Sequence, residues 1–144
     1  MPAVEYFAQD VPFKIPAARK TTAWIREVIR LESRQLEHLN FIFCSDQYLL
    51  EVNRRYLKHD SYTDIITFDN SDAPDTLEGD IFISVERVGE NASERRLRFE
   101  DELHRVLIHG VLHLIGYSDK SPRQKSTMRK KEDAYLSLRK DFIE

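Results

Sequence analysis

The chain has 144 residues, of which 41% are hydrophobic and 33% charged, with only four glycines and five prolines. This length and composition predict one well-packed domain over residues 1–144 and exclude a disordered or low-complexity protein. The formal net charge of −3 argues against a general polyanion binder, so any nucleic-acid contact must come from local clusters of basic residues.

Signals for export or membrane insertion are missing from the sequence. The first ten residues lack the basic region and apolar core of a signal peptide, and no apolar run approaches the ~18 residues of a membrane span. The single cysteine, Cys44, has no partner for an internal disulfide and follows an apolar run, which favours a buried thiol. We therefore expect a cytoplasmic protein without membrane contacts.

Strands and helices alternate in the first half of the chain. Residues 4–8 read as a short strand, and residues 18–34 as a helix with an apolar stripe at helical spacing. Residues 36–44 form a second, largely apolar strand. Ser45 is a suitable N-cap for a further helix that reaches Leu57.

The second half begins with strands at residues 64–68 and 79–85, separated by an acidic loop, and a helix starts near Ser84. Residues 100–115 form an apolar helix that Gly116 ends, because glycine adopts the left-handed C-cap conformation at little cost. A last helix starts at a capping box formed by Ser121 and Gln124, with Pro122 at its first position. A seven-residue repeat of Met128, Tyr135 and Phe142 gives this helix an apolar face that docks on the body of the domain. The pattern predicts an α+β domain with a small mixed four-stranded sheet and about five helices.

The most informative segment, residues 109–119, reads HGVLHLIGYSD. Residues four apart on a helix point in nearly the same direction, so His109 and His113 can share one ion. Gly116 lets the chain fold back, so that Asp119 can approach the same ion as a third ligand. Three protein ligands would leave a position for water, and zinc would lower the pKa of that water toward ~7.

Two other interpretations of this segment remain open. The histidine pair could be satisfied by backbone groups or carboxylates, with no metal at all. The spacing also matches the long helix motif of zinc peptidases, but that motif has its glutamate general base where this chain has Gly110. A peptidase is therefore the less favoured hypothesis.

The same segment resembles the motif His-Gly-x-Leu-His-Leu-x-Gly-Tyr-Asp-His of the YbeY family of bacterial endoribonucleases and rRNA maturation factors. Residues 52–68 are similar to the family segment Asn-x-x-Tyr-Arg-x-x-Asp-x-x-Thr-Asp-Val-Leu-Ser-Phe, and residues 78–84 to its Gly-Asp-Ile strand. Met128 and Glu132 match its closing helix. The resemblance implies an α+β fold with the metal helix beside the sheet edge, and cleavage of single-stranded RNA by a metal-bound water. It also implies 16S rRNA 3′-end maturation and ribosome quality control, with the small ribosomal subunit and its proteins as partners.

Two positions depart from the family pattern. Asp119 replaces the third histidine, a harder ligand that makes the metal less Lewis-acidic. The resemblance implies one divalent ion, usually zinc, and the aspartate ligand admits iron, nickel or manganese as alternatives. Leu57 replaces an arginine after the tyrosine, so a cationic contact to phosphate is missing there. Both departures favour an alternative hypothesis, a ribosome-assembly factor with a structural metal and with weak or absent nuclease activity.

Candidate catalytic and RNA-binding residues follow from position and charge. Glu102 lies on nearly the same helix face as His109, two turns earlier, and could orient a ligand or take a proton; an ion pair is its alternative role. Asp64 starts a strand that the resemblance places beside the cleft, and it could instead fix a turn. The expected RNA-binding residues are Arg54, Arg55, Arg95, Arg96 and Arg98.

Overall fold

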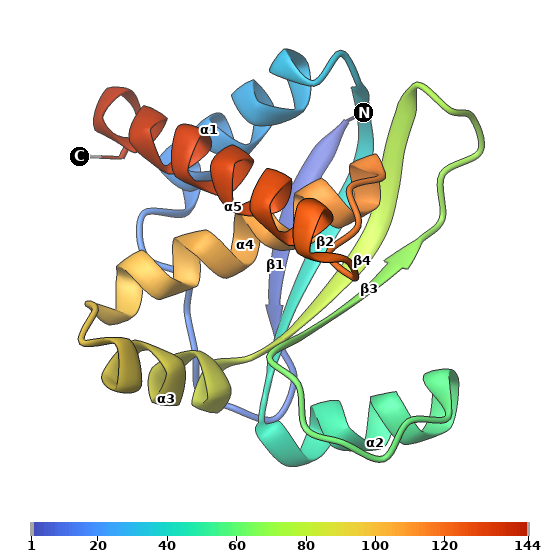
Figure 1. Cartoon of the computed structure of the whole chain (residues 1–144), viewed down its shortest axis with the longest axis vertical. Helices are drawn as coiled ribbons and strands as arrows, with labels where there is room; N and C mark the ends of the chain where they lie inside the picture. Colours follow the sequence, from blue (N-terminus) through green and yellow to red (C-terminus); the bar gives the residue numbers. More distant parts are fainter. Residues whose placement is uncertain (1, 144) are drawn as a thin grey trace.

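The computed structural model describes residues 2–143 as one sheet, five α-helices and a short terminal 3-10 helix (Figure 1). The elements in chain order are β1 (Ala3–Ala8), α1 (Ala18–Leu31), β2 (Gln35–Cys44), α2 (Asp46–Leu57), β3 (Ile65–Asp69), β4 (Thr76–Ser84), α3 (Val85–Arg95), α4 (Phe99–Ile115), α5 (Pro122–Ser137) and η1 (Leu138–Asp141). No helix within this described part is long and apolar enough to cross a membrane.

The sheet is mixed, with the strand order β1-β2-β4-β3. β1 pairs with β2 and β2 with β4 in parallel, whereas β3 runs antiparallel to β4 and forms one edge. The predicted fold class, an α+β domain with a four-stranded mixed sheet and five helices, is thereby confirmed.

Helices cover the two faces of the sheet unequally. One large apolar core joins α1, α4 and α5 to the strands, and Trp24 at its centre donates a hydrogen bond to the carbonyl oxygen of Tyr135 at 2.8 Å. A smaller cluster lies on the other face under α2, around Cys44, Leu49 and Ile66. Cys44 is buried, as predicted. α4 is thus held between the sheet and α5, which crosses it in Figure 1.

α4 approaches the sheet closely at Gly110. A Cβ atom on Gly110 would lie 2.8 Å from Ile65 Cδ1 on β3 and 3.0 Å from Ile81 Cγ2 on β4. The glycine therefore lets the helix pack directly on the edge of the sheet, as the fold prediction required. A glutamate has no room at this position, so the general base of zinc peptidases has no place here.

Three predicted boundaries were wrong. The helix predicted at 18–34 ends at Leu31, because Ser33 takes a left-handed conformation with φ of 60° and turns the chain into β2. β4 begins at Thr76 rather than at residue 79, since its first residues pair with Gln35 and the next residue of β2. The last helix ends at Ser137, so Phe142 lies beyond it and packs on the core from after η1.

Candidate metal centre

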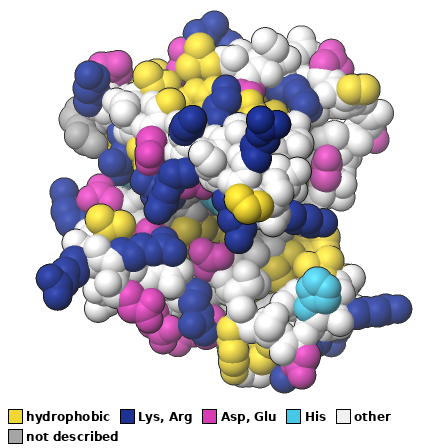
Figure 2. Space-filling model, viewed as in Figure 1, with side chains coloured by type: hydrophobic (Ala, Val, Ile, Leu, Met, Phe, Trp, Pro, Cys, Tyr) yellow, Lys and Arg dark blue, Asp and Glu magenta, His cyan; other side chains and the backbone are white. Residues whose placement is uncertain are grey.

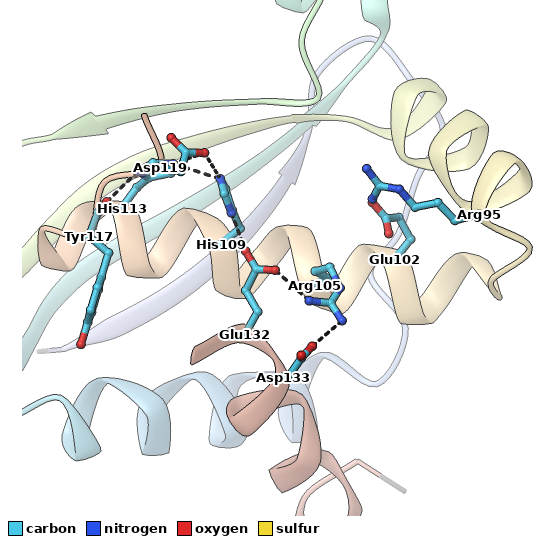
Figure 3. Close-up of polar contacts among 9 residues, drawn as sticks. All are labelled: Arg95, Glu102, Arg105, His109, His113, Tyr117, Asp119, Glu132 and Asp133. Carbon is cyan, nitrogen blue, oxygen red and sulfur yellow. Dashed lines mark hydrogen bonds and ion pairs between the residues drawn. The ribbon is translucent and has the colours of Figure 1, made fainter. Parts of the chain in front are cut away.

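Two histidines and an aspartate meet at the C-terminal end of α4. His109 and His113 project from adjacent turns of the helix. Gly116 has a φ of 122°, and the backbone N–H groups of Gly116 and Tyr117 donate to the carbonyl oxygen of Leu112. This closing turn reverses the chain, as the sequence predicted, and returns Asp119 to the histidines (Figure 3).

The three donor atoms have the spacing of metal ligands. His113 Nε2 lies 2.9 Å from His109 Nε2, and Asp119 Oδ2 lies 3.4 Å from His109 Nε2 and 3.6 Å from His113 Nε2. Ligands bound at ~2.0–2.1 Å in a tetrahedron are separated by about 3.3 Å. The cluster is thus a possible metal site formed by the three residues predicted for it.

Hydrogen bonds at the Nδ1 atoms of His109 and His113 orient the two rings so that both Nε2 atoms face the space between the three donor atoms. His109 Nδ1 lies 2.6 Å from Glu132 Oε2, and His113 Nδ1 lies 2.9 Å from the carbonyl oxygen of Tyr117. Because a carboxylate and a carbonyl accept, each Nδ1 carries the proton and each Nε2 can present a lone pair. Such partners fix the orientation of metal-binding histidines in proteins. The residues therefore fit a divalent ion.

The two imidazoles have opposite pKa shifts. Burial lowers the pKa of His109, but the hydrogen bond and charge of Glu132 outweigh it, with help from Asp119 and Asp64, so the pKa is raised. For His113, burial and the neighbouring His109 lower the pKa. The carboxylates of Glu132, Asp119 and Asp64 therefore stabilise positive charge at His109, which suits the binding of a cation.

Glu132 is the main site residue that the sequence analysis did not identify as functional. Burial raises the pKa of this carboxyl, but hydrogen bonds from His109 and Arg105 outweigh that effect and keep it low. Arg105 donates to Glu132 Oε1 at 2.8 Å and to Asp133 Oδ1 at 2.8 Å. Glu132 comes from α5, and its only sequence signal was the match of the closing helix to the family.

The turn that carries Tyr117 is anchored at its other end by Glu32. Tyr117 donates its hydroxyl to Glu32 Oε1 at 2.7 Å, and Lys131 Nζ lies 3.0 Å from Glu32 Oε2, which also accepts from Tyr135. Glu32 follows α1, so three distant segments are joined behind the metal turn. This anchor holds the carbonyl that orients His113.

A recess of about 350 Å³ adjoins the donor atoms, and its walls are mostly charged. Figure 2 shows Lys and Arg side chains around a hollow near the middle of this face, with acidic side chains inside it. The recess is lined by Asp64, Arg95, Glu102, Arg105, Val106, His109, Asp119, Lys125, Met128, Arg129 and Glu132. The structure therefore brings Asp64, Glu102 and Arg95 together with two of the metal-site residues.

The other predicted arginines lie outside this recess. Arg54 and Arg55 are on α2, where Arg54 is paired with Asp60 and Glu51. Arg96 and Arg98 belong to the turn between α3 and α4. A second recess, on the α2 side, is lined by Leu57 and His113 together, so the position of the missing arginine does border the metal centre.

Comparison with known proteins places the chain in a family. The family model described as "Endoribonuclease YbeY" matches residues 7–139. The chain belongs to the YbeY family. Proteins named Endoribonuclease YbeY from Cytophaga hutchinsonii and Bacteroides thetaiotaomicron are 50% and 45% identical to it, covering 94% and 95% of this chain and 94% and 99% of their own. The resemblance stated from the motifs is confirmed.

A solved structure supports the YbeY fold. The solution structure of TM1509 from Thermotoga maritima superimposes with a TM-score of 0.67 at 26% identity, covering 95% of this chain and 89% of that one.

Proposed function

We propose that this YbeY-family chain is a metal-dependent endoribonuclease that cuts single-stranded RNA during 3′-end maturation of 16S rRNA. The observation that carries the proposal is the convergence of His109, His113 and Asp119, with both histidines oriented through Nδ1, at the border of a recess lined by both cationic and acidic side chains. The substrate places the enzyme in the cytoplasm, in contact with the small ribosomal subunit and its proteins.

The three converging side chains would hold one divalent ion. Two imidazoles and a carboxylate suit zinc, and the single oxygen donor also admits iron, nickel or manganese. When bound, the ion supplies an ionised water near neutral pH and positive charge at the phosphorus.

Residues of the chain itself supply the remaining parts of phosphodiester cleavage. Glu132 orients His109, and Asp64, which borders the recess, would accept the proton that the attacking water releases. Lys125 and Arg129 line the same recess, and no ion pair within residues 2–143 involves their side chains. They are therefore available to contact phosphate oxygens.

The predicted arginines outside the recess would contact phosphates of the RNA strand at some distance from the cleaved phosphate. Arg96 and Arg98 flank the start of α4, and Arg54 and Arg55 lie on α2 beyond the second recess. Because phosphate contacts add up along a strand, their loss should weaken binding of all sequences alike. Glu102 lies about 10 Å along the helix axis from His109, so we assign it to substrate binding rather than to proton transfer at the same phosphate.

The direct test is cleavage of a 5′-labelled single-stranded RNA by purified protein, with and without a chelator. We expect cleavage that stops on chelation and returns with zinc, and a rate at least 100-fold lower in a His109→Ala variant. The complementary duplex should resist cleavage. Equal cleavage by wild type and His109→Ala would rule out the proposal, since the metal centre would then play no part.

A further inference from the structure

A buried oxygen of Glu102 has no partner within the protein. Among the described residues 2–143, Glu102 Oε1 is the one buried side-chain oxygen or nitrogen without a hydrogen bond. Its side chain is only 1% exposed, while Oε2 accepts from Arg95 Nη1 at 2.7 Å. Leaving such an acceptor unsatisfied costs about 1–3 kcal/mol, so a group that donates a hydrogen bond to Oε1 would be stabilised there.

Glu102 belongs to the wall of the recess that adjoins the metal centre. Glu102 and Arg95 both line the recess, together with His109 two helical turns away. Figure 3 shows the Glu102 carboxylate on the same side of α4 as the His109 imidazole, with Arg95 reaching over it from α3. The volume of about 350 Å³ lies within the roughly 300–1,000 Å³ range of ligand pockets.

The charges around Glu102 decide which chemical group fits there. A phosphate is repelled by the carboxylate, and a metal cation is repelled by the Arg95 guanidinium beside it. A neutral group with an N–H donor suits Oε1, and a neighbouring acceptor on the same group suits the remaining N–H groups of Arg95. An adjacent donor and acceptor are what the Watson–Crick edge of a base presents.

We propose that Arg95 and Glu102 form a base-reading subsite that takes the Watson–Crick edge of an unpaired base, one or two nucleotides from the cleaved phosphate. This inference rests on the proposed ribonuclease function and deepens it, because in a duplex that edge is already paired and the subsite stays empty. The Arg95 side chain is 52% exposed, so its guanidinium has room to shift and admit the base while still holding Oε2. Selection of single strands then follows from these two side chains.

The test is a binding measurement in which bases are removed one at a time. A fluorescent single-stranded RNA of ten nucleotides is prepared in versions that are each abasic at one position, and a chelator is present throughout so that the RNA is not cleaved. Dissociation constants are measured by anisotropy at fixed salt for wild type, Glu102→Gln, Arg95→Gln and Arg96→Gln. Arg96 is the matched control, because it loses the same charge one residue away but does not line the recess.

We expect one position at which removal of the base weakens binding to wild type by about tenfold, the effect of losing one good base contact. At that position the same removal should cost less than twofold in Glu102→Gln and in Arg95→Gln, because the contact is already lost. Arg96→Gln should bind every RNA more weakly but keep the tenfold effect. Equal losses on removing each base in all four proteins would overturn the subsite.

The subsite and the nuclease can fail separately in this design. Loss of metal-dependent cleavage with the base effect intact would contradict only the proposed enzyme activity. Intact cleavage without the base effect would contradict only the subsite. If Glu102→Gln does not fold, as judged by circular dichroism, the half-exposed Arg95→Gln decides the result alone.

Discussion

At the residue scale, the metal centre depends on a contact that its own sequence motif does not contain. Glu132 lies 2.6 Å from His109 Nδ1 and comes from a different helix, 23 residues further along the chain. It fixes the proton on Nδ1 and so the direction of the Nε2 lone pair. The carboxylate is itself held by Arg105, which also binds Asp133.

We predict that Glu132→Gln lowers zinc affinity by about 10- to 100-fold, the usual effect of losing such a partner of a metal-binding histidine. Zinc binding would be measured by competition with a chromophoric chelator. Asp133→Asn is the control, because it removes a carboxylate from the same Arg105 without touching His109. An equal fall in affinity in both variants would mean that the loss arises from Arg105 rather than from the histidine contact.

Leu57 occupies the position at which the YbeY motif has an arginine, and it borders the second recess beside His113. We predict that Leu57→Arg raises kcat/KM for single-stranded RNA by about tenfold, since a hydrogen bond to a charged group contributes roughly 1.5–3 kcal/mol. Leu97→Arg adds the same charge at a leucine of similar exposure, 43% against 41%, and should raise the rate less than twofold. Equal gains would point to net charge instead of position.

At the element scale, the position of α4 depends on the absence of a side chain at Gly110. The helix touches β3 and β4 where Ile65 and Ile81 lie within 3.0 Å of an added Cβ atom. Ile81 is fully buried in the core and Ile65 is partly buried against it, so at least the Ile81 side chain has little space to withdraw.

Gly110→Ala should lower the free energy of unfolding by about 1–3 kcal/mol, because the extra methyl overfills the contact between α4 and the sheet. Gly89→Ala, in the middle of α3, is the matched control, since its added Cβ would meet Phe99 only at 3.9 Å. There the higher helix propensity of alanine should stabilise the protein by up to about 1 kcal/mol. Urea denaturation measures the free energy of unfolding of both variants. A Gly110→Ala protein that is more stable than wild type would contradict the close packing of α4 on the sheet.

The local sequence predicted the helices and strands better than it predicted the contacts between them. The spacing of His109, His113 and Gly116 predicted the ligand geometry, because helix pitch and a glycine cap are local properties. Glu132 could not be placed from the sequence, since its approach to His109 depends on how α5 packs across α4. The interpretation of Glu102 as an ion-pair residue was correct in part, but its unsatisfied oxygen is visible only in the assembled recess.

At the scale of the whole molecule, α4 connects the metal centre to the core through His104. This histidine packs edge-on against Trp24 of α1, with ring centroids 5.4 Å apart, and its Nδ1 accepts from Arg139 Nη1 at 2.9 Å. Burial, followed by the charge of Arg139, lowers its pKa from 6.5 to about 4. His104 is therefore a neutral part of the core at neutral pH.

Because the unfolded chain binds a proton on His104 at a higher pH than the folded chain, acid favours unfolding. The stability that comes from keeping His104 neutral is complete above pH 6.5 and is lost as the pH falls toward about 4. We predict that His104→Gln, although less stable at pH 7, loses less melting temperature between pH 6.5 and 4 than wild type. Parallel melting curves for the two proteins over this range would contradict the lowered pKa.

The central claim is that one metal ion, held by His109, His113 and Asp119, is required for cleavage of RNA. The most direct measurement is the cleavage rate of metal-free protein titrated with zinc, with bound metal determined by elemental analysis in the same samples. The account predicts a rate that rises with bound zinc and saturates at one ion per chain, with neither binding nor cleavage in His109→Ala. A cleavage rate that does not depend on bound metal would contradict it.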